Sequence, residues 1–182
     1  MNSNLCRVIS MTLASVMIFG WNVVQAREGF YAGAGGGLAH IKIDESGVDF
    51  DSDDFGWKLF AGYQFNEYFG VEGGYVDFGD QSDSFAGTNV KVDADGLDLY
   101  AVGFLPVAED WDLFGKVGFI AWNADVKAFG QTEGDDGEDL ALGAGAAWHV
   151  NETFALRAEF EWFDIDDTDE VWLLSLGGAF KF

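Results

Sequence analysis

The sequence predicts an all-β protein, an eight-stranded antiparallel up-and-down transmembrane β-barrel. Three observations support this prediction. Apolar and smaller or polar side chains alternate with a period of two along most of the chain, which is the pattern of strands with two unlike faces. Connectors alternate between tight turns and longer polar segments, as they do in membrane-spanning barrels. Apolar residues make up 49% of the chain, yet no run after residue 26 is long enough for a transmembrane helix.

The first 26 residues have the features of an export signal. Arg7 provides a positive charge, residues 8–21 are apolar, and Val24-Gln25-Ala26 suits a signal peptidase. We therefore expect a signal peptide over residues 1–26, cleavage after Ala26, export across the inner membrane, and a barrel domain over residues 27–182. A retained membrane anchor is the alternative, but no stop-transfer pattern follows Arg27. The only cysteine, Cys6, precedes the apolar run, so no disulfide is expected in the barrel.

Acidic residues dominate the charge of the chain. Thirty-two of them oppose nine lysines and arginines, which gives a net charge of −23. A field of this sign repels phosphates, so we expect no nucleic-acid partner. Aromatic residues make up 16% of the chain, and this content argues against acidic disorder.

Eight strands are expected in order along the barrel domain. We place them near residues 30–41, 55–65, 68–78, 97–107, 111–123, 139–150, 154–164 and 171–182. Most have about the length that crosses a bilayer as a tilted strand. The seventh strand shows the alternation clearly: one parity carries Phe154, Leu156, Ala158, Phe160 and Trp162, and the other carries Ala155, Arg157, Glu159, Glu161 and Phe163.

The connectors differ in length at the two ends of the predicted barrel. Tight turns are expected at residues 66–67, 108–110 and 151–153, and their central glutamates recur as a weak hairpin repeat. Longer acidic loops are expected near residues 42–54, 79–96, 124–138 and 165–170. Because a membrane barrel leaves no open edge, the first strand should pair with the last.

Alternation alone also fits a soluble, lipocalin-like periplasmic barrel that binds an apolar ligand. The membrane alternative is favoured because aromatic residues gather near the strand ends, as in interfacial girdles. At the turn end these residues are Tyr63, Phe65, Tyr68, Phe69, Trp111, Trp148, Phe154 and Phe182, and at the loop end they are Phe55, Trp57, Tyr75, Trp122, Trp162 and Trp172.

Four segments resemble a known family. They are residues 29–37 (GFYAGAGGG), 70–75 (VEGGY after Gly70), 156–160 (LRAEF) and 174–182 (LSLGGAFKF). In this order they resemble the small outer-membrane barrels of the OmpA and OmpX type. The resemblance implies a Gram-negative outer-membrane location and a C-terminal assembly signal at Phe180 and Phe182, read by the barrel-assembly machinery. Since the sequence ends at Phe182, we expect no periplasmic peptidoglycan-binding domain of the kind that many OmpA relatives carry.

Six charged residues are predicted to face the lumen. They are Lys58, Glu72, Lys116, Arg157, Glu159 and Glu161. Charges inside a narrow barrel are costly unless they are paired. We expect a largely plugged lumen held by this ion-pair network, with a switchable gate in a narrow ion or small-solute pore as the alternative. A wide porin channel needs many more strands.

Catalysis, cofactors and dedicated metal sites are not predicted. The acidic run at residues 49–54 lacks the glycine and glutamate spacing of an EF-hand, so divalent cations at the acidic loops are only a secondary expectation. His40 and His149 have no neighbouring serine for a lipid-modifying enzyme, and Glu159 and Glu161 lie where no sugar chain fits. We expect a structural or surface-interaction role, contacts with outer-membrane lipids and lipopolysaccharide, and a monomer.

Overall fold

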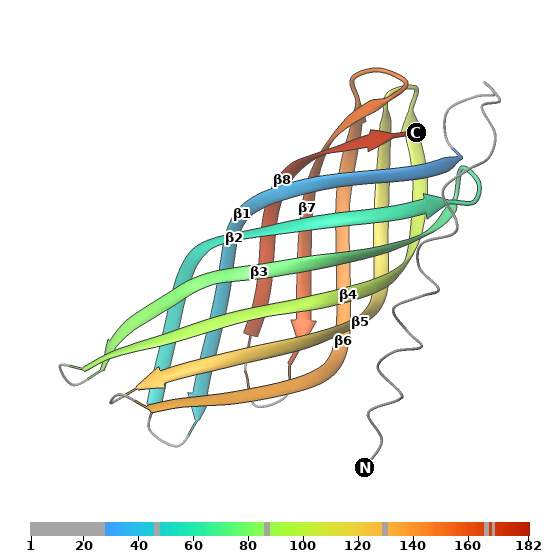
Figure 1. Cartoon of the computed structure of the whole chain (residues 1–182). Helices are drawn as coiled ribbons and strands as arrows, with labels where there is room; N and C mark the ends of the chain where they lie inside the picture. The colour runs from blue at the N-terminus through green and yellow to red at the C-terminus, as the bar shows by residue number, and fades with distance from the viewer. Residues whose placement is uncertain (1–27, 46–47, 86–87, 129–130, 166–167, 169) are drawn as a thin grey trace, which may run out of the picture.

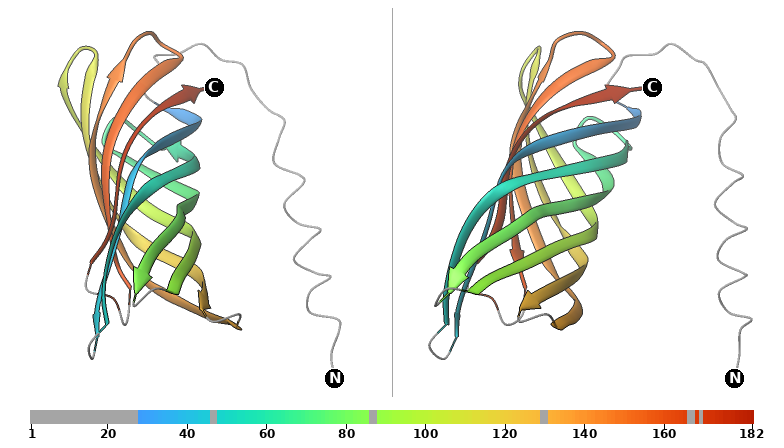
Figure 2. Two further views of the ribbon diagram at one scale, coloured as in Figure 1. Left: turned by 90° about the vertical axis from the view of Figure 1, so that its left-hand side faces the viewer. Right: turned by 60° about the vertical axis from the view of Figure 1, so that its left-hand side comes forward.

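A computed structural model describes residues 28–45, 48–85, 88–128, 131–165, 168 and 170–182. Within them, eight antiparallel strands form one closed barrel in chain order, as Figures 1 and 2 show. The strands are β1 (Gly29–Glu45), β2 (Val48–Gln64), β3 (Phe69–Phe85), β4 (Thr88–Ala108), β5 (Trp111–Ala128), β6 (Gln131–His149), β7 (Phe154–Asp164) and β8 (Glu170–Lys181). The predicted fold class is confirmed.

The predicted signal peptide over residues 1–26 and its cleavage after Ala26 lie outside the described residues. Among the residues that the structure describes, no helix is long and apolar enough to cross a membrane.

The barrel closes where the first strand meets the last. β1 pairs with β8 from Tyr31↔Lys181 to Lys42↔Glu170, so the predicted closure is confirmed. Glycines allow the two backbones to approach closely at this seam. A side-chain carbon at Gly37 would run into the carbonyl of Leu174, and one at Gly177 would run into the carbonyl of Ala34.

Three hairpins extend well beyond the strand ends predicted from the sequence. Most of the residues predicted as loops at 42–54, 79–96 and 124–138 continue the strand pairs β1–β2, β3–β4 and β5–β6. The loop prediction was therefore wrong for these segments. Apolar alternation marks only the part of a strand that faces lipid, whereas hairpin hydrogen bonding continues among polar residues. Figure 1 shows the long hairpins projecting at the end away from the C-terminus.

The projecting hairpins do not all pair with one another. β2 and β3 are paired only from Trp57↔Asp77 to Gln64↔Gly70. Beyond that point, a register irregularity between Asp77 and Asp80 bends β3, and Gly79 adopts a positive φ of 80°. A glycine suits this position because side chains disfavour that conformation.

Two of the tight turns share one construction. The side-chain oxygen of Asn66 accepts hydrogen bonds from the backbone N–H groups of Tyr68 (2.8 Å) and Phe69 (3.0 Å). Asn151 does the same for Thr153 and Phe154, at 2.9 Å each. Side-chain bonds of this kind stabilise an asparagine turn, and backbone bonds from Phe65 N to Phe69 O (2.9 Å) and from Val150 N to Phe154 O (3.0 Å) close the same two turns.

The two faces of the barrel differ as the alternation predicts. Large apolar side chains are exposed on the outer face, among them Leu59, Leu99, Val117, Phe119, Leu156 and Leu176. An exposed apolar belt of this extent suits a lipid environment. One girdle residue was assigned wrongly: Trp122 shares the inward parity of buried Ile120, packs against the core and donates a hydrogen bond to Asp139 Oδ2 (2.7 Å).

Candidate functional site

The lumen contains a compact cluster of six charged side chains. They come from four strands: Lys58 from β2, Glu72 from β3, Lys116 from β5, and Arg157, Glu159 and Glu161 from β7. Their exposed fractions are 1%, 1%, 4%, 6%, 3% and 0%, respectively. The structure thus places all six residues that the sequence assigned to the lumen in one buried group, called here the ion cluster.

Two lysines bridge the glutamates of the ion cluster. Lys58 Nζ lies 2.5 Å from Glu161 Oε2 and 3.2 Å from Glu159 Oε1. Lys116 Nζ lies 3.0 Å from Glu72 Oε1 and 2.8 Å from Glu161 Oε1, and it also pairs with Glu159. Each lysine therefore contacts more than one carboxylate, so the cluster is a network and not a set of isolated pairs.

Arg157 completes the network on the side of the short turns. Its Nη1 donates to Glu72 Oε2 at 2.6 Å, and its Nη2 donates to Glu159 Oε2 at 3.2 Å. The guanidinium carbon lies 4.4 Å from the ring centres of both Phe60 and Phe114. Aromatic faces attract a cation at this separation, so two rings and two carboxylates hold the arginine.

Two tyrosines pack against the cluster from inside the barrel. Tyr31 Oη donates a hydrogen bond to Glu72 Oε2 at 3.0 Å. Lys116 Nζ lies 4.2 Å from the ring centre of Tyr100. Both rings are almost completely buried, so they shield the ion pairs from water and strengthen them electrostatically.

Apolar side chains fill the lumen toward the loop end. Ala39, Ile41, Val76, Phe78, Ile120, Phe163, Val171 and Leu173 are all buried in one apolar cluster. The rings of Phe78 and Phe163 meet edge to face with centres 5.2 Å apart. On the turn side of the ion cluster, Tyr31, Phe60 and Ala179 form a second, smaller cluster. The charges are thus enclosed by apolar layers on both sides.

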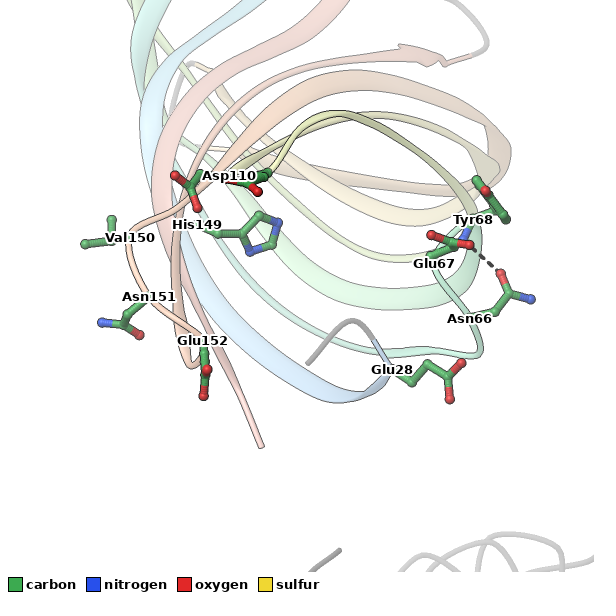
Figure 3. Close-up of a pocket in the computed structure, with 10 residues that line it drawn as sticks. Glu28, Asn66, Glu67, Tyr68, Asp110, His149, Val150, Asn151 and Glu152 are labelled. Atoms are coloured by element: carbon green, nitrogen blue, oxygen red, sulfur yellow. Dashed lines mark hydrogen bonds between the residues drawn. The ribbon is translucent and has the colours of Figure 1, made fainter. Parts of the chain in front are cut away.

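The turn end of the barrel opens into a vestibule of about 650 Å³ (Figure 3). Its rim carries Glu28, Glu67, Glu109, Asp110 and Glu152. His149 also lines it, and its Nε2 lies 2.7 Å from Oδ2 of buried Asp112. Sequence patterns do not indicate the pairing of His149 with a carboxylate, because the two residues are 37 positions apart.

The remaining candidate residues from the sequence lie away from the cluster. His40 lies near the loop end, where its ring stacks on Trp172 and its Nδ1 lies 2.8 Å from Asp53 Oδ1. Phe180 and Phe182 are exposed at the turn end, and their role as an assembly signal stays a prediction. Among the described residues, no group of three or more His, Cys, Asp or Glu side chains could hold a metal ion. Parts of the acidic segments 49–54 and 164–170 fall outside the described side chains.

Two buried carboxylates are absent from the predicted set of lumen residues. Asp98 and Asp112 are 7% and 3% exposed and point inward. A signal is present in the sequence, because Asp98 shares its parity with Tyr100 and Val102, and Asp112 shares its parity with Lys116. That signal is weak, because Asp98 is a single carboxylate among apolar residues and Asp112 lies beside a turn.

Comparisons with known proteins agree with this geometry. The family described as "OmpA-like transmembrane domain" matches residues 25–172. Outer membrane protein A of Klebsiella pneumoniae is 31% identical over 72% of this chain and 42% of its own length. The same protein of Yersinia pseudotuberculosis is 34% identical over 71% of this chain and 40% of its own length. The chain therefore spans about two fifths of the length of these relatives, and the matched part is the barrel region.

A solved structure gives the same result at the level of the fold. The attachment invasion locus protein Ail of Yersinia pestis is 25% identical, with a TM-score of 0.58 over 85% of this chain and 99% of that one.

Proposed function

Because the chain belongs to the family of OmpA-like transmembrane domains, we propose that it serves the outer membrane as a structural or surface-interaction barrel with a plugged lumen. Its location in a Gram-negative outer membrane follows from the family, the closed barrel and the exposed apolar belt. The alternative of a soluble periplasmic barrel is therefore wrong.

The burial of the ion cluster is the observation that supports a plug most strongly. All six side chains are at least nine-tenths buried, and apolar layers lie on both sides of them. An ion that crosses this layer would have to separate charges that are already paired in an environment of low dielectric constant, and such a separation costs several kcal/mol. An eight-stranded barrel is also just wide enough for its interior side chains to fill it.

A narrow pore is the second candidate, and the sharing of partners within the cluster favours it. Lys116 contacts three glutamates and Lys58 contacts two. A lysine with several partners can exchange one for another at little cost, and this exchange could open a path. The turn end also offers an approach toward the cluster. A second cavity lies beside the vestibule, His149 lines both of them, and Arg157 of the ion cluster lines the second.

The surface-interaction role rests on the loop end of the barrel. Three hairpins extend past the apolar belt, and the chain is strongly acidic. Ail, whose barrel is similar, is described as the attachment invasion locus protein of Yersinia pestis. We propose that the extended hairpins contact other molecules at the cell surface, with lipopolysaccharide as the first neighbour and divalent cations as bridging ions.

Two further parts of the proposal concern assembly and chemistry. We propose that the exposed aromatic end of β8, Phe180 and Phe182, engages the barrel-assembly machinery and that the barrel works as a monomer. The relatives named above are outer membrane proteins and carry no enzyme names. The absence of catalysis stays a prediction for this chain.

Solute efflux from vesicles tests the plug. The refolded barrel is inserted into phosphatidylcholine vesicles loaded with sodium and glycine. The efflux of both solutes is compared with that from protein-free vesicles loaded in the same way. A plugged lumen predicts equal rates at every ratio of protein to lipid. Efflux that rises in proportion to the number of barrels per vesicle would instead support the pore.

A further inference from the structure

Asp98 is a buried carboxylate that no cation of the described chain neutralises. It is 7% exposed, and its Oδ2 has no hydrogen-bond partner. It faces inward from β4, directly opposite Gly74 of β3 and Ile120 of β5. Among the described residues, the three cations of the ion cluster make their ion pairs with Glu72, Glu159 and Glu161 and none with Asp98.

The charge of the ion cluster together with Asp98 is therefore unbalanced by one; the other buried carboxylate, Asp112, lies apart from them against His149 at the turn end. Three cations face three glutamates within the cluster, and Asp98 adds a fourth carboxylate beside them. The charged groups that act on it are Glu161, Lys58, Lys116 and Glu72, and each of these already has a partner within the cluster. A bare carboxylate in such a place costs several kcal/mol, and proteins avoid this cost by neutralising the group.

The structure leaves room for the carboxylate but supplies no partner. A side-chain carbon at Gly74 would lie 2.8 Å and 3.1 Å from the two carboxylate oxygens, so the missing side chain makes the space that Asp98 occupies. The neighbouring inward residues, Val76 and Ile120, are apolar and fully buried. These two side chains offer no hydrogen-bond donor, and the hydroxyl of Tyr100, two residues along β4, makes no hydrogen bond to Asp98.

We infer that Asp98 binds one positive charge from outside the chain, either a proton or a sodium ion, and so balances the charge of the layer that it forms with the ion cluster. This inference rests on the proposed plug, because it treats Asp98 and the ion cluster as one neutral layer. The composition of the surrounding solution then acts on the plug through Asp98.

The test compares unfolding in urea of the wild type and of Asp98→Asn in phosphatidylcholine vesicles. Asparagine keeps the shape of the aspartate side chain and needs no counter-ion. The ratio of the wild-type unfolding constant to that of the variant therefore measures the effect of the Asp98 charge alone. If a proton is bound, the wild-type constant rises relative to the variant by up to about tenfold per pH unit above about pH 4, where an unfolded aspartate ionises. If sodium is bound, the ratio falls as sodium replaces choline at constant pH and ionic strength, by up to about tenfold per tenfold rise in sodium.

Glu161→Gln is the matched control. It also removes one buried carboxylate, but it leaves Lys58 and Lys116 without one of their partners, so it should destabilise the barrel in every buffer. The inference is overturned if Asp98→Asn destabilises the barrel as Glu161→Gln does, or if the wild-type to Asp98→Asn ratio stays constant in both the pH and the sodium series.

Measurements on the wild type alone cover the case in which Asp98→Asn does not fold. The infrared spectrum at neutral pH should show the carbonyl band of a protonated carboxylic acid, or sodium NMR should show one bound ion per barrel. The absence of both signals would contradict the inference. The vesicle efflux experiment tests the plug in the wild type, with Asp98 unchanged. If no solute leaks but unfolding depends on neither pH nor sodium through Asp98, this inference is overturned and the proposed plug is not.

Discussion

At the scale of single residues, the lumen is stabilised by charges that share partners. Lys58, Lys116 and Arg157 each contact two or more carboxylate groups at distances of hydrogen bonds or close ion pairs. Sharing lowers the number of buried charges that any one side-chain movement can leave unpaired. Removing one member still costs stability, because each carboxylate that it contacts loses one of its counter-charges.

Lys58→Met tests this sharing. The change leaves Glu159 and Glu161 with one lysine fewer, so we expect the free energy of unfolding in vesicles to fall by about 3–5 kcal/mol. In the Lys58→Met variant, Glu161 has lost one of its two lysines. A second change, Glu161→Leu, removes this carboxylate and should restore part of the lost free energy of unfolding. Lys42→Met, which changes a lysine near the loop end of β1, serves as the control and should shift the value by no more than about 0.5 kcal/mol. Equal effects at Lys42 and Lys58 would contradict the network.

The sequence predicted the charged residues of the lumen better than their partners. Period-two alternation identifies which side of a strand a residue faces, so alternation alone was enough to assign Lys58 and Glu161 to the lumen. Alternation carries no information on the register between strands. That register brings Lys58 into contact with Glu161, a residue 103 positions away in the sequence. For the same reason, the contact of His149 with Asp112 and the isolation of Asp98 could not be predicted.

At the scale of elements, the seam between β1 and β8 depends on glycine. Gly37→Val would push a side chain into the carbonyl of Leu174, so we expect the barrel to lose about 1–3 kcal/mol of stability. The matched control is Gly103→Val, because no atom lies within 4 Å of the position its side-chain carbon would take. Urea unfolding and the gel mobility of unheated samples measure both variants. Equal stability of the two would show that close approach at the seam is not required.

The two asparagine turns should contribute independently. Asn66→Ala and Asn151→Ala each remove two side-chain hydrogen bonds to the backbone, and each bond is worth about 0.5–1.5 kcal/mol. Because the turns join different hairpins, the losses in the double variant should add. Asn123→Ala, at an exposed position of β5, is the control. A double variant as stable as the wild type in urea would contradict the role of these turns.

Strand ends were the least predictable feature at this scale. The apolar pattern of β3 and β4 covers the part of each strand that is expected to face lipid, because hydrocarbon accepts only apolar side chains. Beyond that point, acidic residues such as Asp93 continue the pairing of β4 with β3 and β5. Pairing there depends on backbone geometry set by the hairpin, and side-chain polarity does not reveal it.

At the scale of the whole molecule, the barrel presents an apolar belt to lipid. Val117→Arg, near the middle of the belt on β5, should cost about 2–4 kcal/mol, because charge is least tolerated at the bilayer midplane. Val107→Arg, close to the turn that follows β4, should cost about 0–1 kcal/mol. Both valines are 53% exposed, so depth in the membrane is the main difference between them. Equal losses on unfolding from vesicles would contradict this orientation of the barrel.

The central claim is that the ion cluster and the apolar layers around it seal the lumen. Single-channel recording in planar bilayers tests this claim most directly, because it detects one open barrel among many closed ones. A sealed lumen predicts no steady conductance for the wild type and none for Lys116→Met or Glu159→Gln, since apolar side chains still fill the loop end in both variants. A steady conductance that changes when Lys116 or Glu159 is replaced would contradict it and would identify the cluster as the gate of a pore.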